Sequence, residues 1–326
     1  MAVRRRAGSP DAFEAVFEAV SNNVAHALVG KADAIKLALV CLAAEGHLLI
    51  EDVPGVGKTT LAKAMAASFA CDWNRIQFTP DLLPSDVTGV TVFSRTGNRF
   101  EFRPGGVFAN IVLADEINRA SPKTQAALLE AMEERQVTVD STTYGLPDPF
   151  MVIATQNPVE HEGTYPLPDS QLDRFLMRIA MGYPAKRAEI AMLDEHATDN
   201  PVAHLTAVAS VADVATLVKG AQAVHVAPQL RAYIVDIADA TRRHPSLTLG
   251  VSPRAALALQ RTARAWAAAS GRDYANADDV KAVALPVLGH RVVPTPEAEF
   301  DGVGSDAVLE DLLTRIPVPS SSATRN

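Results

Sequence analysis

The stretch Leu48-Leu-Ile-Glu-Asp-Val-Pro-Gly-Val-Gly-Lys-Thr-Thr60 decides the fold of this chain. An apolar segment that is predicted to be a strand leads into a turn with two glycines, and a helix-forming run begins at Leu61. This order is typical of a P-loop, in which backbone N–H groups and a helix N-terminus converge on the phosphates of a nucleotide. We expect Lys58 to reach the β- and γ-phosphates and the Thr59 hydroxyl to bind Mg²⁺.

The loop departs from the usual pattern at its first position, where Asp52 replaces glycine. The core from Gly55 to Thr59 is intact, and the preceding proline stiffens the turn. We therefore expect one continuous stretch to hold the nucleotide. Its members are Pro54, Gly55, Val56, Gly57, Lys58, Thr59 and Thr60.

A second segment supplies two acids. The run Ile111–Ala114 reads as a strand buried on both faces of a parallel sheet, and Asp115 and Glu116 follow it directly. Ligands bind at the carboxyl ends of such strands. Asp115 is therefore predicted to orient the Mg²⁺ water shell, and Glu116 to take a proton from an attacking water. Together with the loop, this pair predicts nucleotide hydrolysis.

Composition and charge restrict the remaining possibilities. The 326 residues suit two domains, and 48% hydrophobic with 21% charged residues is ordinary for a globular protein. The formal net charge of −8 argues against general nucleic-acid binding, although a local basic strip remains compatible with it. Cys41 and Cys71 predict buried thiols rather than a disulfide framework. No segment has the length of a membrane span, so we expect a cytoplasmic protein.

The pattern along the chain predicts an α/β domain over residues 1–200 and a small all-helical lid domain over 201–316, with a disordered tail at 317–326. In the α/β domain, a parallel sheet is flanked by helices. Residues 88–107 interrupt the alternation of strands and helices as a β-hairpin insert, and Gln136–Leu146 reads as a second hairpin. The insert could be a plain surface hairpin or a loop that reaches a partner.

The chain resembles the AAA+ ATPases, and among them the MoxR family of the helix-2-insert clade. The resemblance covers about residues 25 to 290. It rests on Glu51-Asp-Val-Pro-Gly-Val-Gly-Lys-Thr59, Leu113-Ala-Asp-Glu-Ile-Asn-Arg-Ala120, Lys123-Thr-Gln-Ala-Ala-Leu-Leu-Glu-Ala-Met-Glu-Glu134, Ala154-Thr-Gln-Asn-Pro158, Gly163-Thr-Tyr-Pro-Leu-Pro168, Gln171-Leu-Asp-Arg-Phe175 and Ser252-Pro-Arg-Ala255.

The resemblance implies further site residues. Asn157 matches the sensor-1 position, whose carboxamide would hold the lytic water, and Arg254 matches sensor 2, which would reach the phosphates from the lid. Val29 and Gly30 match the segment that contacts adenine. Arg174 matches the arginine finger that acts on the nucleotide of a neighbouring subunit, and an ion pair with Asp173 or Asp169 is its alternative reading. Arg178 and Arg119 are competing finger candidates.

The family implies ATP and Mg²⁺ as ligands, a homo-oligomeric and typically hexameric ring, and a separate partner with a von Willebrand factor A domain. Its expected role is chaperone-like maturation, assembly or remodelling of proteins. The ATPase subunit of a magnesium or cobalt chelatase is an alternative, since the two families share the insert and the finger segment. A nucleic-acid motor agrees less well with the acidic balance. A scaffold that binds ATP without turnover disagrees with the intact Lys58, Asp115, Glu116 and Arg174.

Overall fold

The computed structural model describes residues 10–158, 163–196 and 201–319, and these fall into two compact units. Residues 16–215 form the first unit. The second unit joins residues 216–319 with the described start of the chain up to Ala15. Within the described residues, no helix combines the length and the apolar character that a membrane crossing requires.

The sequence predicts a domain boundary after residue 200, which is the last of the undescribed residues 197–200. The observed boundary between the units lies elsewhere. Contacts divide the chain between Ala215 and Thr216, within helix α8 (Val211–Ala223). The chain start groups with the second unit because the Phe13 ring lies against Gly220, where an added Cβ would come within 2.8 Å of the ring. The predicted tail is described only over residues 317–319, which have no regular secondary structure, and its other residues lie outside the described part.

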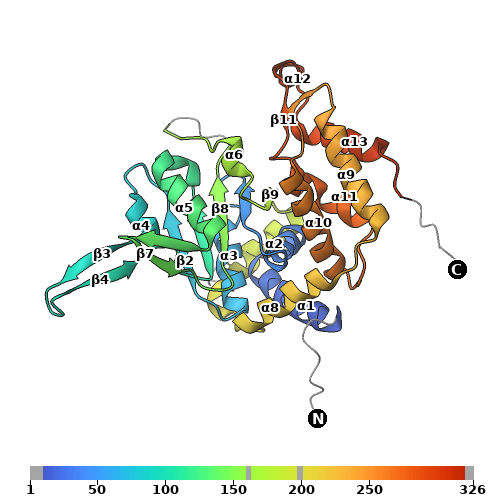
Figure 1. Ribbon diagram of the computed structural model, residues 1–326. Helices are drawn as coiled ribbons and strands as arrows, with labels where there is room; N and C mark the ends of the chain where they lie inside the picture. Colours follow the sequence, from blue (N-terminus) through green and yellow to red (C-terminus); the bar gives the residue numbers. More distant parts are fainter. Residues whose placement is uncertain (1–9, 159–162, 197–200, 320–326) are drawn as a thin grey trace, which may run out of the picture. The chain divides into compact units, whose positions relative to one another are not determined.

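A five-stranded sheet with the order β2-β5-β8-β1-β9 forms the centre of the first unit (Figure 1). Each pair of neighbouring strands is parallel, as predicted. The carboxyl ends of the strands therefore meet at one edge of the sheet, which is where ligands bind in this architecture. The strands are β1 (Leu48–Glu51), β2 (Trp73–Gln77), β5 (Ile111–Asp115), β8 (Met151–Gln156) and β9 (Met177–Ile179).

Helices cover the sheet because its strands are apolar on both sides. On one face, Leu49 and Val152 pack in a core with Leu128 of α5. Helix α3 contacts β2 and β5, and α2 contacts β9. The central strands are buried along nearly their whole length, which rigidly positions the residues at their carboxyl ends. Helices of the chain up to residue 215 include α1 (Pro10–Ala27), α2 (Ala32–Ala43), α3 (Lys58–Ser68), α4 (Pro84–Thr88), η1 (Ile117–Arg119), α5 (Pro122–Glu134), α6 (Asp169–Leu172), α7 (Lys186–His196) and η2 (Pro201–His204).

Both predicted hairpins are present, and they differ in their packing. The insert is the pair β3 (Gly89–Ser94) and β4 (Arg99–Pro104), and the second hairpin is β6 (Gln136–Val139) and β7 (Thr142–Gly145). The β6–β7 hairpin is attached to the core through Val137 and Tyr144. The β3–β4 hairpin instead exposes two aromatic rings in edge-to-face contact, Phe93 and Phe100, whose centroids are 5.3 Å apart.

The second unit is a helical lid. Serine and asparagine N-caps begin two of its helices: Ser252 accepts a hydrogen bond from the Ala255 N–H at 3.1 Å, and Asn276 accepts one from the Asp279 N–H at 3.0 Å. The expectation of an all-helical domain is wrong in one detail, since the unit also contains a short antiparallel pair of strands, β10 and β11. These strands are too short to show a recognisable alternation of apolar and polar residues in the sequence. The elements are α9 (Pro228–Arg242), β10 (Leu247–Leu249), α10 (Pro253–Ala268), α11 (Ala277–Leu288), β11 (Val293–Pro294), α12 (Pro296–Phe300) and α13 (Ser305–Arg315).

Candidate nucleotide-binding site

The glycine-rich turn between β1 and α3 has the backbone conformation of a phosphate-binding loop. Gly55 and Gly57 have φ angles of +86° and +98°, in the left-handed region that favours glycine. A Cβ at Gly57 would also come within 2.6 Å of the Leu28 side chain. Helix α3 begins at Lys58, directly after the turn and earlier than the expected start at Leu61. The helix N-terminus and the loop N–H groups therefore face the same space.

Asp52 does not have a positive φ, so this loop does not require glycine at its first position. Its carboxylate accepts hydrogen bonds from the N–H groups of Val53 at 2.8 Å, Met181 at 2.7 Å and Gly182 at 2.6 Å. The Lys31 ammonium donates to the carbonyl groups of the same two residues, Met181 and Gly182. Asp52 thus fastens the start of the loop to the chain that follows β9.

Lys58 lies at the centre of the charges around the loop. Burial lowers the pKa of its ammonium, and the neighbouring charges of Asp52, Asp115 and Glu116 oppose this shift in that order. Its Nζ donates a hydrogen bond to the Asp52 carbonyl. The ammonium is therefore positioned within electrostatic reach of both acids at the end of β5.

The two acids stand at the carboxyl end of β5, where the strand leaves the buried core. Asp115 is the last residue of the strand, and Glu116 has a left-handed conformation with φ 58° and ψ 49°. This conformation costs a residue with a Cβ about 1 kcal/mol, so the surrounding contacts must impose it. One of them is the hydrogen bond from the Glu116 N–H to Thr155 Oγ1, at 2.9 Å.

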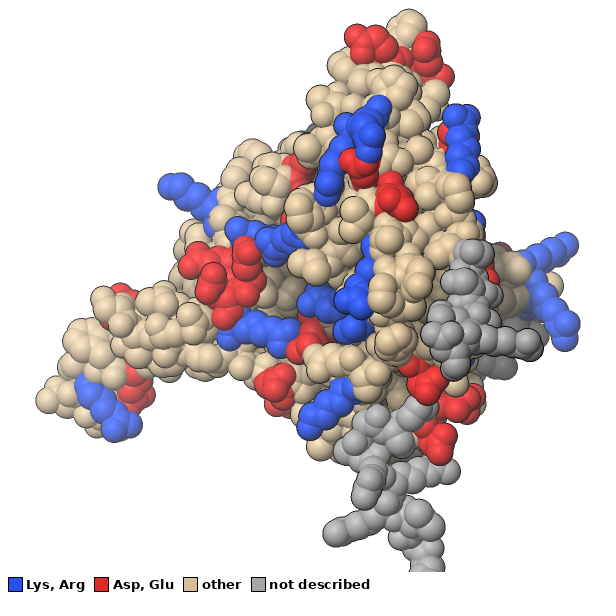
Figure 2. Space-filling view, turned by 45° about the vertical axis from the view of Figure 1, so that its right-hand side comes forward, with Lys and Arg blue, Asp and Glu red and all other residues tan. Residues whose placement is uncertain are grey.

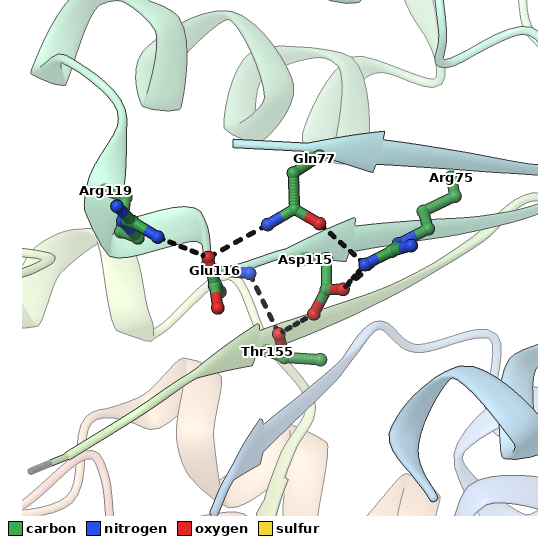
Figure 3. Close-up of polar contacts among 6 residues, drawn as sticks. All are labelled: Arg75, Gln77, Asp115, Glu116, Arg119 and Thr155. Carbon is green, nitrogen blue, oxygen red and sulfur yellow. Dashed lines mark hydrogen bonds and ion pairs between the residues drawn. The ribbon is translucent and has the colours of Figure 1, made fainter. Parts of the chain in front are cut away.

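Side chains from two neighbouring strands hold both carboxylates (Figure 3). The Thr155 hydroxyl of β8 donates to Asp115 Oδ1 at 2.6 Å, and Arg75 of β2 donates to Asp115 Oδ2 through Nη2 at 2.6 Å and Nε at 3.1 Å. Glu116 Oε2 accepts hydrogen bonds from Gln77 at 2.9 Å and Arg119 at 3.0 Å. The acid pair is therefore oriented by hydrogen bonds as well as by its place on the sheet.

Arg75 and Gln77 were not singled out from the sequence. A signal exists, because they alternate with Ile76 and Phe78 and so share one face of the strand. What the sequence does not give is the neighbour of β2: the register places Gln77 opposite Asp115 on β5. That pairing brings the two polar side chains to the acids.

A pocket of about 400 Å³ joins the loop to the acids. It gathers nine of the predicted site residues, together with Arg75 and Thr155. Asn157 enters it from the chain just after β8. The lining residues are Pro54, Gly55, Gly57, Lys58, Thr59, Thr60, Arg75, Asp115, Glu116, Thr155 and Asn157.

Some predicted site residues lie outside this lining. The Val56 side chain is buried. Val29 and Gly30 lie in the turn between α1 and α2, and a Cβ at Gly30, whose φ is +77°, would come within 2.5 Å of Ala188 on α7. Arg254 belongs to the second unit, in the first turn of α10. The assigned role of each remains a prediction.

The three arginine-finger candidates all contact acids of the same unit. Arg174, which follows α6, pairs with Glu133 of α5 at 3.2 Å rather than with the Asp173 or Asp169 considered from the sequence. Arg178 pairs with Glu51 at 3.1 Å. Arg119 bonds to Glu116 beside the pocket, as described above. The intrachain contacts alone therefore do not single out one finger.

The donor set at the end of β5 fits Mg²⁺. Hard divalent cations prefer carboxylate and hydroxyl oxygens together with phosphate oxygens, and the pocket presents the Asp115 carboxylate and the Thr59 hydroxyl. Among the described residues, histidine, cysteine and acidic side chains do not gather anywhere into a group of three or more that could hold a metal ion without other ligands. These two residues are the ones that would hold the ion.

Comparison with known families agrees with this geometry. Residues 47–177 match the model of the ATPase family associated with various cellular activities (AAA), and residues 239–312 match the AAA lid domain. The chain is 51% identical to the uncharacterized protein YeaC of Bacillus subtilis over 292 residues, which cover 90% of this chain and 91% of the relative. It is 39% identical to chaperone MoxR1 of Mycobacterium tuberculosis over 318 residues, with 95% and 82% covered.

Further similarity extends over most of the chain. Protein MoxR of Paracoccus denitrificans is 33% identical over 329 residues, covering 93% of this chain and 96% of the relative. A crystal structure of a candidate ATPase from Cytophaga hutchinsonii superposes with a TM-score of 0.90 at 38% identity, covering 95% of this chain and 97% of the other. An AAA domain, a helical lid and these relatives together lead to one conclusion: the chain belongs to the MoxR family of AAA+ ATPases.

Proposed function

We propose that this chain hydrolyses ATP with Mg²⁺ as a protomer of a homo-oligomeric, typically hexameric ring, and that hydrolysis drives the maturation, assembly or remodelling of partner proteins. The observation that carries the proposal is the meeting of Lys58, Asp115, Glu116 and Asn157 around one pocket. Each of these side chains has a chemical task in phosphoryl transfer to water. Their convergence supports turnover over a scaffold that only binds nucleotide.

Different residues of the pocket have different chemical roles in this proposal. The loop N–H groups and Lys58 bind the phosphate charge. Glu116 accepts a proton from the attacking water, and Asn157 holds that water through its carboxamide. Asp115 and Thr59 would hold Mg²⁺, which would supply positive charge against the phosphate charge. Arg254 is expected to contribute a second cation from the lid.

In this proposal, Arg174 completes the site of the neighbouring protomer. An arginine supplied in trans stabilises charge in the transition state and typically raises the rate by ~10³–10⁵. Every finger finds a site only if the head-to-tail contact closes into a ring. The pair with Glu133 at 3.2 Å would hold the guanidinium in place before it engages a neighbour.

Mixing two inactive variants tests the finger. Arg174→Ala keeps its own Glu116, and Glu116→Gln keeps its own Arg174, so rings of both variants contain some sites with all groups intact. We expect phosphate release to reappear on mixing. Arg178→Ala in place of Arg174→Ala is the matched control. Full activity of Arg174→Ala alone, or no recovery on mixing, would reject the trans assignment.

Protein partners are proposed over nucleic acid for two reasons. The relatives include one named as a chaperone. The net charge is −8, and Figure 2 shows lysine and arginine side chains interspersed with aspartate and glutamate among the described residues on the face in view. A protein with a von Willebrand factor A domain is the partner that we propose.

A pull-down from native lysate tests this partner class. Glu116→Gln held in ATP is compared with Lys58→Ala, which is expected to bind nucleotide much more weakly, and bound proteins are identified by mass spectrometry. We expect only the ATP-held form to capture a von Willebrand factor A protein. Capture of chelatase subunits would instead support a metal chelatase, and identical protein lists would reject control of partner binding by ATP.

A further inference from the structure

Asp115, the residue proposed to hold Mg²⁺, already forms an ion pair with an arginine through one carboxylate oxygen. Arg75 approaches Oδ2 through both Nη2, at 2.6 Å, and Nε, at 3.1 Å. The other oxygen, Oδ1, accepts the Thr155 hydroxyl at 2.6 Å (Figure 3). Both oxygens of the proposed metal ligand are thus engaged by the protein itself.

The position of Arg75 follows from the sheet. It lies on β2, the edge strand next to β5, two residues before Gln77 and on the same face. Gln77 Oε1 accepts a hydrogen bond from Arg75 Nη2 at 2.7 Å, which directs the guanidinium toward Asp115. Side chains on one face of β2 therefore donate hydrogen bonds to both acids, since Gln77 also donates to Glu116.

The ion pair between Arg75 and Asp115 differs from a structural ion pair that is buried in a core. The Arg75 side chain is 46% exposed and lines the pocket, so it can leave Asp115 without opening a cavity. The charged side chains of the pocket lining are Lys58 and Arg75 against Asp115 and Glu116. The formal charges balance only as long as Arg75 takes part. A divalent cation entering next to a guanidinium meets repulsion that weakens if the guanidinium moves away.

We propose that Arg75 is the internal counter-ion of Asp115 and that Mg²⁺ must displace it from Oδ2 when nucleotide binds. This inference rests on the proposed function, because it concerns the same nucleotide site. Arg75 is then a positioning residue that sets the Mg²⁺ concentration required for loading. In the empty site it neutralises Asp115, which would otherwise lie beside Glu116 with like charge.

The test measures metal dependence of binding rather than turnover. The full chain is titrated with Mg²⁺ from an EDTA-buffered start, in the presence of a fluorescent ADP analogue. We expect Arg75→Gln to lower the half-saturating Mg²⁺ concentration about threefold, the size that a partly exposed charge pair supports. Affinity for the analogue in EDTA stays unchanged. Arg75→Lys, which keeps the charge but loses the two-donor fork, falls between wild type and Arg75→Gln.

Arg119→Gln is the matched control, because it removes the same charge beside the same pocket but from Glu116 instead of Asp115. We expect its Mg²⁺ midpoint to stay close to that of wild type. Equal shifts in Arg75→Gln and Arg119→Gln would mean that only the general field of the pocket changed, and the proposal would be overturned. Weaker binding of the analogue by Arg75→Gln in EDTA would overturn it too, because Arg75 would then be a phosphate ligand.

The proposed function can fail separately. Absence of phosphate release from ATP would remove the ATPase assignment and leave the displacement of Arg75 measurable with ADP. Absence of ADP binding by the wild-type chain at every Mg²⁺ concentration would overturn both. Thermal melting of each variant checks that its fold is intact.

Discussion

The two sides of the nucleotide pocket are built in different ways. On the loop side, backbone conformation sets the shape, through Gly55 and Gly57 with positive φ and a helix that begins at the next residue. On the acid side, side-chain hydrogen bonds set the orientation of Asp115 and Glu116. The backbone side is suited to binding the same phosphates each time. The acid side is suited to an exchange of partners of the kind proposed for Arg75, because side-chain hydrogen bonds hold it.

The largest effect is expected on the acid side. Glu116→Gln removes the proposed base and keeps the shape of the side chain, so we expect kcat for ATP hydrolysis to fall by ~10²–10⁴. Nucleotide affinity should stay nearly unchanged, because the loop is untouched. Phosphate release and analogue binding measure the two quantities. A parallel loss of affinity would contradict the separation of the two sides.

A smaller effect is expected on the loop side. Lys58→Ala removes a charge-assisted contact to phosphate worth ~1.5–3 kcal/mol, so nucleotide affinity should fall roughly 10- to 100-fold. Lys63→Ala is the control, because Lys63 lies on the same helix with its Nζ over the Trp73 ring, at 5.0 Å from the centroid, and outside the pocket lining. Isothermal titration with ADP checks both. Equal losses in the two variants would point to damage of α3 rather than to a lost phosphate contact.

Glycine replacements test what determines the conformation of the loop. Both Gly55→Ala and Gly57→Ala impose an unfavourable positive φ, at a cost of ~1–2 kcal/mol. Only a Cβ at Gly57 also meets the Leu28 side chain, since nothing lies within 4 Å of one at Gly55. We therefore expect a larger loss of ADP affinity and of melting temperature in Gly57→Ala. The reverse order would mean that packing against Leu28 does not shape the loop.

The smallest effect concerns pH. Burial lowers the pKa of Lys58, so its phosphate-binding charge is lost at a lower pH than for a free lysine of pKa 10.5. ADP affinity should fall as pH rises through the lowered pKa, by at most about tenfold per pH unit. Stability of the empty chain should change in the opposite direction, because the unfolded state binds more protons between the two pKa values. Lys58→Arg, whose charge persists, should bind ADP with a flatter pH profile.

The sequence predicted the loop side better than the acid side for a physical reason. A P-loop is local: one strand, one turn and one helix start contain all its parts, so Gly55 to Thr59 could be read directly. Apart from the local contact of Glu116 with Arg119, the contacts described for Asp115 and Glu116 come from β2 and β8, and they depend on which strands are neighbours in the sheet. Arg75 and Gln77 therefore became visible only in the folded chain. The Glu133 partner of Arg174 was missed for the same reason.

Prediction of the fold from the sequence is limited in the same way, because it also depends on local patterns. Long apolar or alternating segments, such as β5 and the β3–β4 hairpin, were predicted close to their observed bounds. The strands β10 and β11 were missed because strands of three and two residues carry almost no periodic signal. The grouping of Phe13 with α8 could not be read either, since it depends on a contact between distant parts of the sequence.

Asp52 makes the first position of the loop a mechanical joint. Three N–H groups share its carboxylate, one from the loop and two from residues 181–182, which lead from the sheet toward α7. A shift of those two residues by more than a hydrogen-bond length must either break this joint or pull the start of the loop with it. A displacement of the chain beyond β9 therefore reaches the loop through the Asp52 carboxylate in addition to the pairing of β9 with β1, and a glycine at this position could not provide the carboxylate link.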